Sequence, residues 1–121
     1  MYKIALVQPD SPFLTYPLAF PSLGLLYISS YLKAHGYNPD FYDLTGGKTL
    51  PEIEADVIGF SCQITQWRAV KEMRDKLKGT FVIGGSYPTF SECQGFHVIR
   101  GEGEVKFLNY LEGTNKLESV D

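Results

Sequence analysis

The chain has 121 residues, of which 44% are hydrophobic and 21% charged, as expected for a single globular domain with one core. Its net charge is -3 and its acidic and basic residues are interspersed, so it lacks the basic surface typical of proteins that bind nucleic acid or membranes. The first apolar run, 4–7, is shorter than a signal-peptide core or a membrane span. We therefore expect a cytoplasmic protein.

Five predicted strands alternate with three predicted helices along the chain. The stronger strand candidates, such as KIALV at 3–7 and TFVIGG at 80–85, are continuously apolar, which is typical of strands buried on both faces of a parallel sheet. The helices are predicted to end at Gly36, Gly79 and Gly113. The predicted strands cover 3–7, 38–44, 56–61, 80–85 and 96–99, the predicted helices cover 21–36, 65–79 and 104–113, and brief helical turns are expected at 49–54 and 88–93.

This alternation of strands and helices predicts right-handed βαβ crossovers. The expected fold class is α/β: a flavodoxin-like (Rossmann-like), doubly wound sheet of five parallel strands in a single domain. We expect this domain to span 1–113 and the tail 114–121 to be a linker or disordered.

Open α/β sheets bind ligands beyond the carboxyl ends of their strands, so the residues that follow each predicted strand are the candidates for binding. None of these loops has the G-x-G-x-x-G or P-loop pattern that cradles a phosphate, which disfavours a bare nucleotide site. A phosphoreceiver is also disfavoured, because Ser61 stands where the acceptor aspartate would follow the middle strand. The candidates are Asp10, Pro12, Ser61, Gln63, Gly84, Gly85, Ser86, Tyr87, Gly101, Glu102 and Gly103.

Catalysis by this chain alone has little support in its sequence. His35 is predicted at a helix end and His97 inside a buried strand, and both positions indicate structural roles. No histidine is placed to activate Cys62 as a nucleophile. The two cysteines, Cys62 and Cys93, lack the spacing typical of zinc or iron–sulfur sites, and no disulfide is expected in a reducing compartment.

Four stretches carry a family resemblance. They are PSLGLLYISSYLKAHGY at 21–37, DVIGFSCQIT at 56–65, VIGGSYPT at 82–89 and VIRGEGE at 98–104. Together, and in this order, they resemble the N-terminal cobalamin-binding domain of cobalamin-dependent radical S-adenosylmethionine enzymes, whose first helix has a Pro-x-Leu-Gly-Leu-Leu-Tyr pattern and whose later loop has a Gly-Gly-x-x-Pro-Thr pattern. The resemblance runs from about Lys3 to Leu111.

The resemblance implies roles for the loops after the third and fourth predicted strands. Ser61 would meet the nucleotide tail of cobalamin. Gly84 and Gly85 would leave room for that tail between the sheet and its helices. Ser86 and Tyr87 would line the loop nearby.

The resemblance also implies a role for the last loop. Gly101 and Gly103 would let the backbone fold close to the cofactor. Glu102 would then accept hydrogen bonds from the amide groups of cobalamin or from a neighbouring domain. The alternative is that Glu102 only forms a surface ion pair with Arg100, which would contribute little.

The sequence departs in two ways from cobalamin proteins more generally. Many cobalamin domains outside this family supply a cobalt-ligating histidine from Asp-x-His-x-x-Gly; aligning Asp10 with that aspartate puts Pro12 at the histidine and Thr15 at the glycine. The resemblance therefore implies base-off cobalamin without a protein histidine ligand. The family's catalytic barrel, with its iron–sulfur cluster and S-adenosylmethionine, would be a following domain that the 121 residues do not contain.

We accordingly expect a cobalamin-binding module that is not catalytic alone and presents its cofactor to a separate or missing radical S-adenosylmethionine domain. It would be an excised domain or a stand-alone relative of a methyltransferase or oxidoreductase of that kind. The alternative is a cofactor-free protein-interaction or regulatory module of the same fold. A weaker alternative is a flavodoxin-like receiver or a flavin-binding protein.

Overall fold

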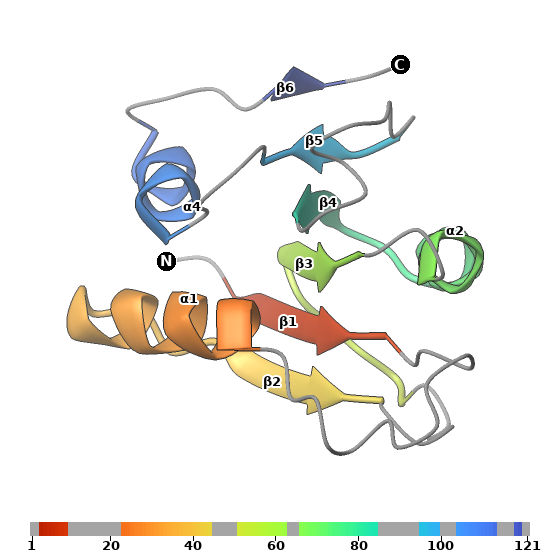
Figure 1. The fold of residues 1–121 in the computed structure, drawn as a ribbon, viewed down its shortest axis with the longest axis horizontal. Helices are drawn as coiled ribbons and strands as arrows, with labels where there is room; N and C mark the ends of the chain where they lie inside the picture. Colours follow the sequence, from red (N-terminus) through yellow and green to blue (C-terminus); the bar gives the residue numbers. More distant parts are fainter. Residues whose placement is uncertain are drawn as a thin grey trace.

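The computed structural model describes residues 3–9, 23–44, 51–62, 66–84, 95–99, 104–113 and 118–119. Strands and helices are interspersed along these residues (Figure 1). The strands are β1 (Ile4–Gln8), β2 (Asp40–Asp43), β3 (Val57–Ser61), β4 (Thr80–Gly84), β5 (His97–Val98) and β6 (Glu118–Ser119). The described helices are α1 (Leu23–Ala34), α2 (Trp67–Lys76) and α4 (Glu104–Leu111).

The strands form one sheet in the order β2-β1-β3-β4-β5-β6. The first five pair in parallel, which confirms the predicted flavodoxin-like α/β fold. The order reverses between β1 and β3, and this is the point where open α/β sheets bind their ligands. The last strand, β6, pairs antiparallel to β5. It lies within 114–121, where no pattern in the sequence predicts this sixth strand.

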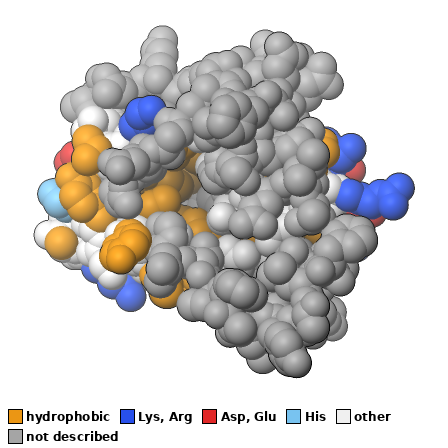
Figure 2. Space-filling view, in the orientation of Figure 1, with side chains coloured by type: hydrophobic (Ala, Val, Ile, Leu, Met, Phe, Trp, Pro, Cys, Tyr) orange, Lys and Arg blue, Asp and Glu red, His pale blue; other side chains and the backbone are white. Residues whose placement is uncertain are grey.

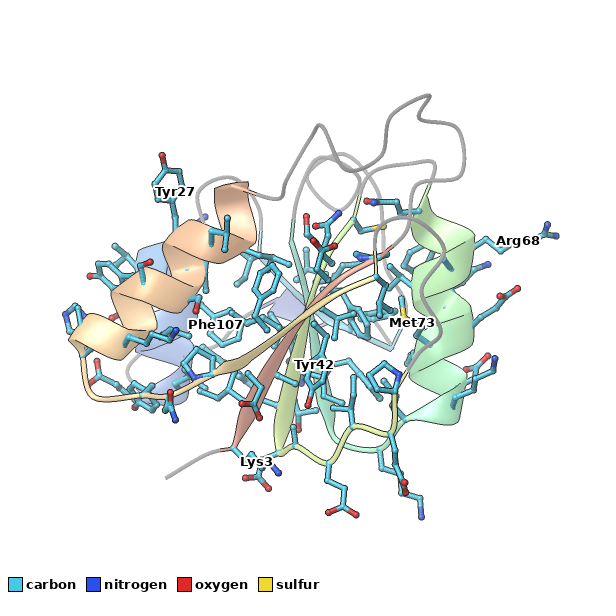
Figure 3. All side chains as sticks on the ribbon, turned by 90° about the horizontal axis from the view of Figure 1, so that it is seen from below. Lys3, Tyr27, Tyr42, Arg68, Met73 and Phe107 are labelled. Atoms are coloured by element: carbon cyan, nitrogen blue, oxygen red, sulfur yellow. The ribbon has the colours of Figure 1, made fainter. Side chains whose placement is uncertain are left out.

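The helices cover both faces of the sheet. Figure 3 shows α1 and α4 together on one face and α2 on the other. We call the first pair of helices the α1/α4 layer. Successive side chains of a strand point to opposite faces, so β1 contributes Ile4 and Leu6 to the core under the α1/α4 layer and Ala5 and Val7 to the core under α2. Every residue of β1 is buried, as its apolar run at 4–7 predicts, and the polar Gln8 is buried with them.

Glycines end two of the helices, as expected, but not the third. After α1, Gly36 has a φ of +90°. There the backbone N–H of Tyr37 donates to the carbonyl of Leu32, and that of Gly36 donates to the carbonyl of Lys33, which is the Schellman pattern. Gly113 likewise follows α4 with a φ of +75°.

The prediction that Gly79 ends the second helix is wrong, because α2 already ends at Lys76. Gly79 instead has a φ of +142° beside the start of β3, where a Cβ atom would lie 2.9 Å from the carbonyl oxygen of Ala55. The expected helical turn at 49–54 is also absent over its described part, since 51–55 has no regular secondary structure.

Replacing Gly79 with alanine should therefore destabilise the fold more than replacing Gly36 does. Both substitutions place a side chain at positive φ, at a cost of about 1–3 kcal/mol each. Only the Gly79 variant also forces a Cβ against a backbone carbonyl, whereas no described atom lies within 4 Å of a Cβ at Gly36. Urea unfolding of the two variants measures the difference. Equal losses would contradict the close approach between Gly79 and Ala55.

Candidate cofactor site

The carboxyl ends of β1, β3 and β4 lie at one edge of the sheet, which we call the carboxyl edge. Ser61 and Gly84, the last residues of β3 and β4, are direct partners in the parallel register. The backbone N–H of the next residue, Cys62, donates to the Gly84 carbonyl at 2.8 Å. Continuing the register to the neighbouring strands defines one row, the edge row, which consists of Gln8, Ser61, Gly84 and Ile99.

The edge row faces the α1/α4 layer. Leu6 and Val82 belong to the core under that layer. Because strand side chains alternate, the edge-row residues two positions farther along β1 and β4 face the same side. Gly59, two positions before Ser61, also faces it, since a Cβ there would lie 3.0 Å from Phe107 of α4.

Two glycines, Gly59 and Gly84, lie on this face of the described sheet. At Gly59 the missing side chain is replaced by the ring of Phe107, which Figure 3 shows between the sheet and the α1/α4 layer. At Gly84 a Cβ would be in ordinary contact with Ile99, 3.8 Å from its Cβ. Phe107 therefore limits how deeply a ligand entering beside Ser61 and Gly84 could reach.

Two buried glutamine amides converge beside the edge row. Gln8 Nε2 donates to the Pro9 carbonyl oxygen at 3.2 Å, and Gln66 Nε2, from the turn before α2, donates to the same oxygen at 3.1 Å. Gln8 is only 8% exposed. Its Oε1 atom is buried and has no hydrogen-bond partner among the described residues. Buried polar atoms are nearly always paired, so this buried oxygen at the carboxyl end of β1 is an exception that needs an explanation.

The histidines lie away from the carboxyl edge. His35 follows the end of α1, and its Nδ1 atom lies 2.9 Å from the carbonyl oxygen of Tyr31. His97 is half-buried on β5 and packs on Tyr110, with 5.5 Å between ring centroids. Among the described residues, no group of histidine, cysteine and carboxylate side chains could hold a metal ion.

The opposite edge of the sheet carries a shallow depression of about 890 Å³. Its lining mixes basic and acidic side chains, and the backbone N–H of Lys3 donates to Asp56 at 2.8 Å. Its three basic and three acidic side chains give the lining no net charge that would favour ligands of one sign. The charged residues of the lining are Lys3, Glu52, Glu54, Asp56, Lys76 and Lys78.

Two predicted site residues, Ser61 and Gly84, lie in the described ranges, and the structure places them side by side. Ser61 and Gly84 are register partners at the carboxyl edge. The other predicted site residues lie outside the described ranges: Asp10, Pro12, Gln63, Gly85, Ser86, Tyr87, Gly101, Glu102 and Gly103. Sequence reasoning missed Gln8, although a polar residue that ends an apolar run was a signal that could have identified it.

The comparison with protein families agrees with this arrangement. A family described as "B12 binding domain" matches residues 13–111. The chain belongs to the B12 binding domain family. This membership supports cobalamin as the ligand. A search of curated proteins and a search of solved structures each gave no match.

The residues at the carboxyl edge of this B12 binding domain suit such a ligand. Cobalamin carries amide groups around its corrin ring and hydroxyl groups on its nucleotide arm. Gly84 has no side chain and Ser61 has a small one, and Gln8 offers an acceptor that has no partner among the described residues. No described helix is long and apolar enough to span a membrane.

Proposed function

We propose that this B12 binding domain holds cobalamin without a histidine ligand from its own chain and presents it to a radical S-adenosylmethionine domain or subunit. The match to the B12 binding domain family over residues 13–111 carries the cobalamin part of the proposal. The resemblance of 21–37, 82–89 and 98–104 to the radical enzymes supports the partner. The proposed location is the cytoplasm.

The absence of a histidine ligand is supported by where the histidines lie in the sequence. The segment 9–22, which follows β1, contains no histidine, and Pro12 stands where other cobalamin domains place one. His35 follows the carboxyl end of α1 and packs on Tyr31. A proline has no side-chain donor for a metal, so the lower face of cobalt would receive no nitrogen from this loop.

The proposed role of the chain is to bind and orient the cofactor. When bound, cobalamin supplies a cobalt centre for methyl transfer or for radical rearrangement. Whether the cobalt has an axial ligand changes its redox potential. Ser61 and Gly84 would hold the nucleotide tail beside the sheet. The loops proposed to complete the site contain Asp10, Pro12, Gln63, Gly85, Ser86, Tyr87, Gly101, Glu102 and Gly103.

Hydroxocobalamin added to the purified chain should remain bound through desalting and give a corrin band in the visible spectrum. After reduction to Co(II), the electron paramagnetic resonance spectrum should lack the superhyperfine splitting that an axial nitrogen causes. Loss of the corrin band at high-micromolar cobalamin would contradict the binding proposal. A nitrogen splitting would contradict only the proposed base-off state.

One observation favours the cofactor-free interaction module as a second candidate. Figure 2 shows apolar side chains gathered on the side of the molecule where α1 and α4 lie. The exposed large apolar residues include Leu26 and Tyr27 on α1 and Val105 on α4, and a grouped apolar surface can mark a protein contact. A folded chain that retains no cobalamin would favour this candidate.

The partner is tested separately from the cofactor. The coding sequence that surrounds this chain should include a barrel domain with the three cysteines of a four-iron cluster, in frame or as an adjacent subunit. Absence of such a domain would contradict the radical S-adenosylmethionine partner and leave the cobalamin proposal intact.

A further inference from the structure

The side-chain amide of Gln8 is held in one orientation. Its Nε2 atom donates to the Pro9 carbonyl oxygen at 3.2 Å. Turning the amide over would place Oε1 against that carbonyl, where two acceptors would repel each other. The open atom is therefore an acceptor, and a ligand that satisfies it must supply an N–H or O–H group.

The fold does not need Gln8 to satisfy the Pro9 carbonyl. Gln66 Nε2 donates to the same oxygen at 3.1 Å, and Gln66 is 2% exposed. An apolar residue of similar length at position 8 would leave Pro9 paired and would remove the buried acceptor that has no partner among the described residues. Retaining a glutamine there costs stability in the ligand-free protein, so the residue has a use that the ligand-free fold does not show.

Gln8 also lies where the proposed cofactor arm would enter. It is one register step beyond the pair of Val7 and Phe60, which places it beside Ser61 in the edge row. Leu6, two positions earlier on the same strand, packs under the α1/α4 layer. The Gln8 side chain therefore shares the face of the sheet that carries Ser61 and Gly84.

We propose that Gln8 Oε1 accepts a hydrogen bond from cobalamin, either from an amide N–H of the corrin side chains or from a hydroxyl of the nucleotide arm. This inference rests on the proposed function. It makes Gln8 a cofactor-binding residue that pairs its buried acceptor only in the loaded protein.

The test compares Gln8→Met with Gln66→Met in the full chain, using hydroxocobalamin titration and the melting temperature of the ligand-free protein. Gln8→Met should weaken cobalamin binding about tenfold, which corresponds to about 1.4 kcal/mol, while the ligand-free melting temperature stays equal or rises. Gln66→Met should lower the melting temperature and keep the affinity for cobalamin. An unchanged affinity with a lower melting temperature in Gln8→Met would overturn the inference.

Cobinamide, which lacks the nucleotide arm, identifies the donor. A loss of affinity for cobalamin alone assigns the hydroxyl of the arm, and a loss for both corrinoids assigns a corrin amide. The unaltered protein provides a second readout that needs no variant. The side-chain ¹³Cδ resonance of Gln8 should move when hydroxocobalamin is added, and a resonance that stays fixed while cobalamin is bound would overturn the inference. If the unaltered chain retains no cobalamin, the proposed function fails together with this inference.

Discussion

Gly84→Leu is expected to weaken cobalamin binding more than about 100-fold, the factor that corresponds to roughly 2.7 kcal/mol, while the chain remains folded. Gly84 ends β4 beside Ser61, and its φ is not positive, so a side chain there strains no backbone. The first carbon fits in ordinary contact with Ile99. The rest of a leucine would extend into the space proposed for the nucleotide tail. Retention of the corrin band after desalting measures the effect.

Gly84→Ala is the matched control for this experiment. Its methyl group would lie 3.8 Å from Ile99 Cβ and 3.9 Å from the Ile99 carbonyl oxygen, so it should retain cobalamin. Circular dichroism should show both variants folded. Full binding by folded Gly84→Leu would show that this position does not line the site.

Phe107→Ala is expected to lower the free energy of unfolding by about 3–5 kcal/mol, the usual cost of deleting a buried phenylalanine ring. Phe107 is 2% exposed, and its ring occupies the space that Gly59 leaves on the face of β3. Val105→Ala is the control on the same helix, because Val105 is 54% exposed and should change stability by less than about 0.5 kcal/mol. The midpoint of urea unfolding measures both.

Gly59→Ala tests the packing of the Phe107 ring on Gly59. In the unaltered chain the new Cβ would lie 3.0 Å from Phe107 Cε2 and 3.1 Å from Leu6 Cδ2, which is too close for two buried neighbours to accommodate freely. In the Phe107→Ala background the same methyl group would fill part of the cavity. We expect the effect of Gly59→Ala to be more favourable there by at least about 1 kcal/mol. The same effect in both backgrounds would contradict the packing of Phe107 on Gly59.

The sequence predicted the parallel sheet because its signals are local. Continuous apolar runs identified β1, β3 and β4 to within a residue or two, and Gly36 marked the end of α1. Signals that depend on distant partners were missed. Position 79 favours glycine because a Cβ atom there would collide with the carbonyl oxygen of Ala55, on the segment before β3. The strand β6 forms because it pairs with β5, although Glu118–Ser119 carries no apolar pattern.

The candidate site was also predictable only in part. The proximity of Ser61 and Gly84 follows from parallel strands that end at one edge. The open acceptor of Gln8 was not predictable, because it depends on how Gln66 and Pro9 pack around it. A sequence can therefore indicate which strand ends meet, but not which polar atoms remain unpaired when they do.

The edge strand β2 also has a consequence for how separate molecules meet. It begins with Asp40 and ends with Asp43, and it is the outermost strand on its side of the described sheet. If two copies joined antiparallel along this edge with their β2 strands fully overlapping, Asp40 of each would lie opposite Asp43 of the other. Repulsion between these carboxylates disfavours such joining, so this edge is a poor template for aggregation.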